Sequence, residues 1–220
     1  PAFAGISTAK AGMQPITGKS LTDILFSDKA GTVNPGRNYV LIGQERHDVG
    51  RPNDEGYPIR GIIKDGYLYL HNYKIDRWPA GNPETGYLNT DASPTKTYIL
   101  NTRRNKSEWY FWQLNFGKRV SEELYDIQKD PNCIYNLAKD KKLTTIKDRL
   151  KHFMVQKLKE QKDPRMFGNG DVFDTYEYAG DVKNYYNRFI SGEKVNAGWV
   201  SKTDYDADLQ DKKQEPNPQN

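Results

Sequence analysis

The sequence predicts an α+β fold in which a small antiparallel sheet packs against one long helix near the C-terminus. Two runs rich in β-branched and aromatic residues, 59–64 and 67–71, flank an Asp-Gly pair, which is typical of a β-hairpin. Apolar residues recur with helical spacing over 140–160. The apolar stripe of that helix is expected to cover one face of the sheet.

The first 36 residues are expected to be the tail end of a larger unit. Residues 1–7, PAFAGIS, are apolar and have no helix cap before them. A short helix is predicted over 21–26, with Ser20 or Thr22 as its cap, because four apolar residues fall on one helical face. Residues 31–37 are rich in Gly, Pro and Asn and predict a loop.

Three segments supply the predicted strands. Residues 39–42 are a candidate for a buried strand, and they lead directly into the polar segment 43–48. The hairpin follows a loop at 49–58, and its Asp65-Gly66 pair predicts a type I′ turn, which needs positive φ at both central residues. Residues 124–127 supply the last strand.

The region between the hairpin and the last strand is harder to assign. Residues 72–95 contain several Gly and Pro residues and predict a long ordered loop over the surface. Residues 97–100 fit a short strand or the start of a helix. Residues 107–116 predict an aromatic-rich helix with Trp109, Trp112 and Phe116 near one face.

The long helix has clear ends. Asp140 is a suitable N-cap, and Asp163-Pro164 ends the helix because the residue before a proline is driven out of the α region. A loop at 167–180 and a second helix at 181–190 are expected to follow. We therefore divide the chain into the tail end of a larger unit, a sheet-and-helix subdomain, a C-terminal extension and a disordered tail, with bounds 1–36, 37–163, 164–202 and 203–220.

Composition excludes several classes of protein. The chain has 220 residues and a formal net charge of +4, without the basic stripe or motif of a nucleic-acid-binding protein. No apolar run approaches the ~20 residues that span a membrane. Cys133 is the only cysteine, which excludes an internal disulfide and a multi-cysteine zinc site.

The first candidate site is the polar segment Glu45, Arg46, His47 and Asp48, at the end of a predicted strand and next to a glycine-containing loop. Arg46 could grip a sulfate or carboxylate with two parallel hydrogen bonds, and His47 could donate to an anionic group. The alternative is a solvated strand end with local ion pairs. Arg60 opens the hairpin and could point back toward His47, or it could pair across strands with an acidic neighbour.

The second candidate is Arg77 beside Trp78, because an arginine next to an indole suits stacking on a sugar together with an anionic contact. The alternative is a loop pinned to the domain surface. His71 ends an apolar strand and is expected to be structural. His152 has no ligand partner one turn away, so we predict no metal site, and Cys133 is expected to be a partly buried thiol.

No nucleophile–base pair, phosphate-binding loop or dinucleotide motif is present, so no catalytic residue is assigned within this chain.

Several motifs together resemble sulfatases of the alkaline phosphatase superfamily. The segment E-L-Y-D-x-x-x-D-P-x-x-x-x-N-L-A, from Glu123 to Ala138, resembles a signature near the C-terminus of that family. Glu45-Arg46-His47 and Tyr57-Pro58-Ile59-Arg60 resemble segments of heparan N-sulfatase-like (N-sulfoglucosamine sulfohydrolase-like) members. PAFAGI with GKSL near the start resembles the end of the family's large catalytic domain, which implies that residues 1–36 are the tail end of that domain. Segments that resemble bacterial members of the same branch are DRWPAG at 76–81, SPTK at 93–96, FGKR at 116–119, DPR at 163–165 and GNGD at 168–171.

The resemblance implies a fold and separate roles for a catalytic core and a C-terminal subdomain. Sulfatases have an α/β catalytic core that holds Ca²⁺ and a formylglycine made from a C/S-x-P-x-R motif, whose hydrated aldehyde attacks sulfur. None of those motifs occurs here, and Cys133 is followed by Ile-Tyr-Asn, so it is not the formylglycine precursor. The smaller C-terminal subdomain is a four-stranded antiparallel sheet with a packed helix, and it closes one side of the substrate pocket. His47, Arg46 and Arg60 would then lie near the sugar, supported by Glu45 and Asp48.

Two functions follow as expectations. In the first, the chain is the substrate-recognition part of a periplasmic or secreted sulfatase that degrades glycosaminoglycans such as heparan sulfate, and it is inactive without its catalytic domain. In the second, it is a non-catalytic module that binds sulfated glycans. The expected partners are a sulfated saccharide and the missing N-terminal catalytic domain, with self-association of the isolated chain through exposed apolar surface. A purely structural role would predict that Arg46, His47 and Arg60 can be changed without effect.

Overall fold

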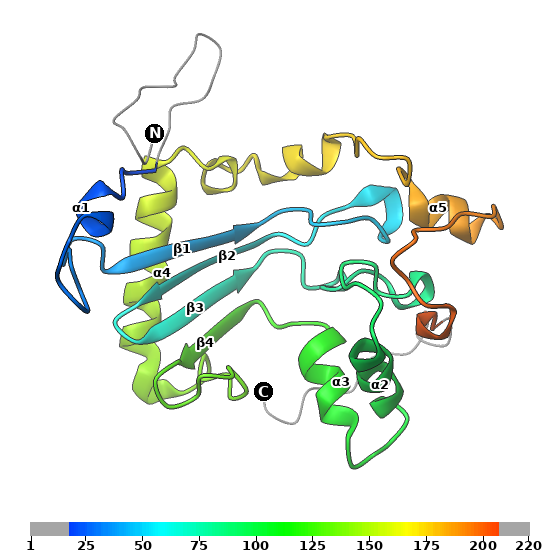
Figure 1. Cartoon of the computed structure of the whole chain (residues 1–220), viewed down its shortest axis with the longest axis horizontal. Helices are drawn as coiled ribbons and strands as arrows, with labels where there is room; N and C mark the ends of the chain where they lie inside the picture. The colour runs from blue at the N-terminus through cyan, green and yellow to red at the C-terminus, as the bar shows by residue number, and fades with distance from the viewer. Residues whose placement is uncertain (1–17, 207–220) are drawn as a thin grey trace, which may run out of the picture.

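The computed structural model describes residues 18–206, in which a four-stranded sheet lies beside a unit of helices and ordered loops (Figure 1). All neighbouring strands are antiparallel, in the order β1 (Tyr39–Gln44), β2 (Ile59–Lys64), β3 (Tyr67–Asn72) and β4 (Glu122–Asp126). The helices are α1 (Thr22–Leu25), α2 (Pro94–Thr102), α3 (Trp109–Phe116), α4 (Thr144–Glu160) and α5 (Tyr185–Ile190). The predicted α+β class, with a long helix on a four-stranded antiparallel sheet, is confirmed.

The predicted hairpin is also confirmed. Asp65 has φ 54° and Gly66 has φ 78°, the two positive values that a type I′ turn requires. The turn fixes the register, so that Lys64 lies opposite Tyr67 and Arg60 lies opposite His71. Register decides which side chains of β2 and β3 face the long helix.

The main core lies between α4 and the sheet. Ile62, Tyr69 and Leu124 from three strands are fully buried against a cluster on α4 formed by Leu150, Met154 and Leu158. In Figure 1, α4 passes behind the strands, so it covers one face of the sheet. Asp140 accepts a hydrogen bond from the backbone nitrogen of Lys142 and caps a 3₁₀ turn, and α4 begins directly after that turn, at Thr144.

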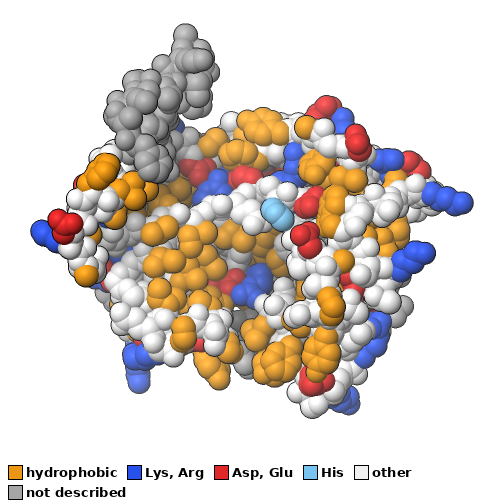
Figure 2. Space-filling view, viewed as in Figure 1, with side chains coloured by type: hydrophobic (Ala, Val, Ile, Leu, Met, Phe, Trp, Pro, Cys, Tyr) orange, Lys and Arg blue, Asp and Glu red, His pale blue; other side chains and the backbone are white. Residues whose placement is uncertain are grey.

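The opposite face of the sheet, here called the open face, is apolar. Strand alternation and register place six branched apolar residues on it, namely Val40, Ile42, Ile59, Ile63, Leu68 and Leu70. Val40 is 57% exposed and Ile42 is 36% exposed. Figure 2 shows apolar side chains gathered on this face. The prediction of a buried strand at 39–42 is therefore wrong for one side of β1, which is an edge strand with only Tyr39 and Leu41 packed against the core.

A second core surrounds the long connection between β3 and α2. Trp78 and Tyr87 are buried against Trp112 and Phe116 of α3 and Leu100 of α2. Residues 80–88 are largely buried, so the prediction of a loop over the surface is wrong. Residues 97–100 lie inside α2, which Ser93 caps through the backbone nitrogen of Lys96, so the strand alternative is wrong as well.

The C-terminal extension completes this unit instead of trailing away from it. The Trp199 indole donates to the carbonyl of Leu88 over 2.9 Å, and Asp206 pairs with Arg103 at 2.6 Å. Asp204 is 1% exposed and accepts a hydrogen bond from Thr97. The predicted start of the disordered tail is therefore wrong for residues 203–206. The other predictions for the two ends of the chain concern residues 1–17 and 207–220, which lie outside the described residues.

Candidate functional site

The predicted site segment, Glu45 to Asp48, directly follows β1 and packs against the loop before β2. Gly56 of that loop lies so close that a Cβ atom there would be 2.5 Å from the carbonyl oxygen of Glu45. Only glycine permits this approach. This contact fixes the position of the backbone that carries the four side chains of the segment.

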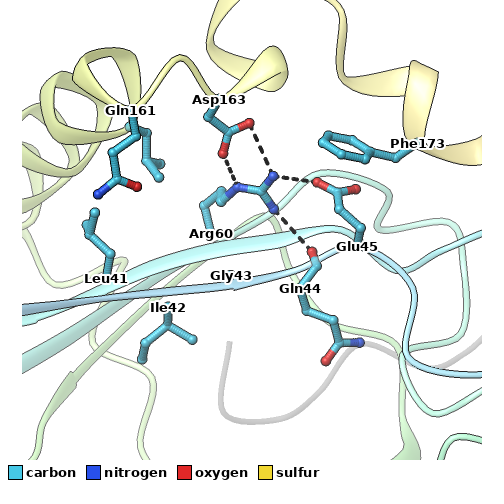
Figure 3. A pocket seen from close by; sticks show the side chains of 10 residues that line it. Leu41, Ile42, Gly43, Gln44, Glu45, Arg60, Gln161, Asp163 and Phe173 are labelled. Carbon is cyan, nitrogen blue, oxygen red and sulfur yellow. Dashed lines mark hydrogen bonds and ion pairs between the residues drawn. The ribbon is translucent and has the colours of Figure 1, made fainter. Parts of the chain in front are cut away.

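Glu45 and Arg60 belong to a largely buried ion cluster with Asp163 and Arg165, here called the strand-end cluster. Figure 3 shows Arg60 between Glu45 and Asp163. The Arg60 guanidinium donates to Glu45 over 2.5 Å and to both oxygens of Asp163, at 2.5 and 3.2 Å. Arg165 donates to both oxygens of Glu45, each over 2.7 Å. The cluster joins the end of β1, the start of β2 and the segment that follows α4.

Every nitrogen of the Arg60 guanidinium is engaged, because Nη1 also donates to the carbonyls of Gln44 and Ile59. Burial alone would lower the pKa of Arg60, but its bonds to Asp163 and Glu45 outweigh that effect and raise the pKa. Arg60 thus stays charged and pairs with acidic neighbours, but these lie after β1 and after α4 and not across a strand pair. His47 is not among its hydrogen-bond partners.

Arg77 and Trp78 are likewise integrated into the fold. Arg77 pairs with Asp174 at 2.9 Å and Glu55 at 3.1 Å, and it donates to the carbonyl of Gly56. Trp78 is 8% exposed and packs edge-on against Tyr87 and Trp112. This geometry matches the alternative of a pinned loop, because the Trp78 ring faces the second core.

Arg46, His47 and Asp48 retain accessible polar groups. The Arg46 guanidinium lies 5.6 Å from the ring centre of Tyr178 and donates to the carbonyl of Asp54 over 3.1 Å. His47 is exposed. Burial raises the pKa of Asp48, although the Val49 backbone N–H, the charge of His47 and the Tyr178 hydroxyl all oppose the shift. These three residues form the exposed part of the site and can contact an anionic or hydroxylated ligand.

Sequence reasoning missed several residues that shape the site. Arg51 is 1% exposed and donates to the carbonyls of Trp78 and Pro79, each over 2.7 Å, and burial lowers its pKa to about 10. Asp174 and Tyr178 come from the C-terminal extension, far along the chain from the loops they hold: Asp174 lies 118 residues after Gly56 and 97 after Arg77, and Tyr178 packs on Arg46. No local sequence pattern marks them, because their role arises from contacts between distant segments.

The remaining candidates are consistent with structural roles. His71 packs edge-on against Tyr73 at 4.4 Å, and burial lowers its pKa. Cys133 is a partly buried free thiol. Among residues 18–206 there is no group of three or more His, Cys, Asp or Glu side chains placed to hold a metal ion. No helix in the same range is long and apolar enough to cross a membrane.

Comparison with known proteins does not assign a family to this arrangement. No protein-family model matches the sequence, and no curated protein is significantly similar to it.

Proposed function

We propose that this chain is the C-terminal, substrate-pocket-forming part of a sulfatase that hydrolyses sulfate esters or sulfamates of glycosaminoglycan-type sugars. The open face of the sheet is the observation that carries the proposal. An apolar surface that spans three strands is typical of a buried contact between folded domains. The N-terminal catalytic domain is the proposed occupant.

The chemistry of the open face suits a folded protein surface. The one charged group that shares it on β4, Glu123, is 2% exposed and accepts hydrogen bonds from Asn72, Arg119 and Tyr125. The Glu123 carboxylate therefore needs no partner from another protein. Burying the six branched apolar residues against an apolar surface would be favourable. An occupant must offer a complementary apolar surface.

The site segment lies at the edge of the open face, directly after β1. A domain docked on that face would meet Arg46, His47 and Asp48 at the rim, so a substrate pocket would form between the two parts. In this proposal the catalytic domain supplies Ca²⁺ and the formylglycine nucleophile, while this chain orients the sugar. His47 donates to the anionic group, Arg46 donates to a neighbouring part of the sugar, and the strand-end cluster keeps the backbone beneath them in place.

The first test is the coding sequence upstream of the codon for Pro1. A C/S-x-P-x-R motif with acidic metal ligands there, and sulfate release from sulfated glucosamine by the complete protein, would support the proposal. A stop codon or an unrelated domain would contradict it and would leave the glycan-binding module as the remaining function.

Docking can be tested separately with the upstream domain and this chain expressed as two proteins. Ile42→Lys puts a charge on the open face, on its edge strand β1, and is expected to abolish their association in sedimentation velocity. Tyr135→Lys is the matched control, because Tyr135 is 61% exposed and lies outside the open face. Equal association of the two variants would refute the docking surface. The unmodified chain alone is expected to self-associate, and Ile42→Lys should reduce this.

A further inference from the structure

A pocket of 290 Å³ lies beside the site segment and is built largely by the C-terminal extension. Its wall combines Arg46 and Asp54 with Tyr176, Tyr178, Lys183 and Asn187 of the extension. This volume is near the lower end of small-molecule sites, which start at about 300 Å³. The pocket therefore suits one ring-sized unit.

The wall chemistry selects a polar ligand. None of the 11 described side chains that line the pocket is Val, Ile, Leu, Met or Phe, and its only rings are two tyrosines. Tyr176 is 56% exposed and offers a flat face with a hydroxyl at its edge. Amide, hydroxyl and aromatic groups around a small pocket are the usual means of holding a polyhydroxylated ring.

Most polar side chains of the wall are paired with one another, and two keep unused hydrogen-bonding capacity. Lys183 pairs with Glu177 at 3.1 Å, and Asn53 and Asn187 bond reciprocally at 2.9 and 3.1 Å. The Arg46 guanidinium, in contrast, has one hydrogen bond and a tyrosine ring for its five N–H groups. Asp54 is 6% exposed, and its Oδ1 atom is buried with no hydrogen bond. A hydroxyl both accepts and donates, so it can serve both groups.

Charge disfavours a sulfate in this pocket. The lining cations, Arg46 and Lys183, are outnumbered by the carboxylates of Asp54, Asp174 and Glu177. A group with a full negative charge would meet this excess of carboxylate, whereas a hydroxyl would not.

The backbone of the wall is held in an unusual shape. Asn53, Asp54 and Asn184 have φ of 55°, 54° and 57°, in the left-handed region that, apart from glycine, mainly Asn and Asp adopt. Such conformations persist where surrounding contacts fix them, and they gather at ligand sites. The backbone nitrogen of Asn184 donates to Asp54 over 2.6 Å, which ties the extension to the loop.

We infer that this pocket binds one unsulfated, hydroxyl-bearing sugar unit of the glycan, next to the sulfated unit that is hydrolysed. The choice of a glycan rests on the proposed function, while the pocket itself lies within this chain. It gives the C-terminal extension a direct role in substrate recognition.

The test is an NMR titration of the full 220-residue chain with three probes, the methyl glycosides of glucose, galactose and N-acetylglucosamine, each up to its solubility limit. We expect at least one to shift the Arg46 Nε–H and Asn187 side-chain signals. Arg46→Gln should weaken that binding about tenfold or more, because hydrogen bonds to a charged group are lost. Tyr176→Ala should weaken it as well, and the equally exposed Tyr135→Ala should leave it unchanged.

Two outcomes would overturn the inference. One is the absence of shifts at these signals with all three glycosides in a folded sample. The other is an equal response to inorganic sulfate, which would make the pocket an anion site. Neither NMR outcome bears on the proposed function, because that function is tested separately by measuring sulfate release by the complete protein. If that protein is active, Arg46→Gln should raise KM with little change in kcat.

Discussion

Removing Arg60 should destabilise the protein strongly, because it would leave the largely buried carboxylate of Asp163 without its cation. The side chains of Arg60, Asp163 and Glu45 are 7%, 11% and 19% exposed. Glu45 would keep Arg165, but Asp163 would keep only the backbone nitrogen of Arg165. Breaking a buried pair on one side costs about 3–5 kcal/mol. For Arg60→Met this corresponds to a fall in Tm of about 6–20 °C in a protein of this size.

The assay is urea unfolding followed by circular dichroism and tryptophan fluorescence, with coincident transitions as the check on two-state behaviour. Arg60→Lys keeps the charge but loses the planar guanidinium with its paired N–H groups. Its free energy of unfolding should therefore lie between those of the wild type and Arg60→Met. Adding Asp163→Asn to Arg60→Met should recover part of the loss, because it removes the uncompensated carboxylate. The reasoning is refuted if Arg60→Met costs less than about 1 kcal/mol, the value of an exposed pair, or if the double variant is less stable than the single one.

Three further predictions concern the sheet, the site loop and activity. Glu122 accepts hydrogen bonds from Lys151, Tyr69 and Lys147, which outweigh the opposing effect of burial and lower its pKa to about 2. Its stabilisation is therefore fully present above its unfolded pKa of 4.5 and is lost as the pH falls through its folded pKa of about 2. In thermal unfolding, Glu122→Gln should cost about 1 kcal/mol at pH 7, after allowance for solvent screening, and progressively less as the pH is lowered to 2 and below. Gly56→Ala should cost about 1–3 kcal/mol in urea unfolding, since its Cβ would collide with backbone, and an unchanged midpoint would contradict that packing. If the complete protein is the proposed sulfatase, His47→Ala should lower its kcat/KM by roughly 10- to 1000-fold, and an unchanged value would exclude a substrate contact.

Local chemistry in the sequence was enough to predict the hairpin and the long helix. Asp65 and Gly66 specify a type I′ turn because they tolerate positive φ, and the apolar period of 140–160 specifies a one-sided helix. The abrupt rise in polarity after the apolar run 39–42 also predicted that residues 45–48 follow the end of a strand. These features depend on residues within a few positions of one another, so they can be derived from the sequence alone.

Contacts between distant segments decided the rest. The pairing of Arg60 with Asp163 joins positions 103 apart, and this contact turns a candidate substrate ligand into a structural cation. The burial of Trp78 depends on α3, and the pocket beside Arg46 depends on the C-terminal extension. The sequence also could not distinguish a strand buried on both faces from an edge strand with one open face, because the same apolar run fits both until the neighbours of β1 are known.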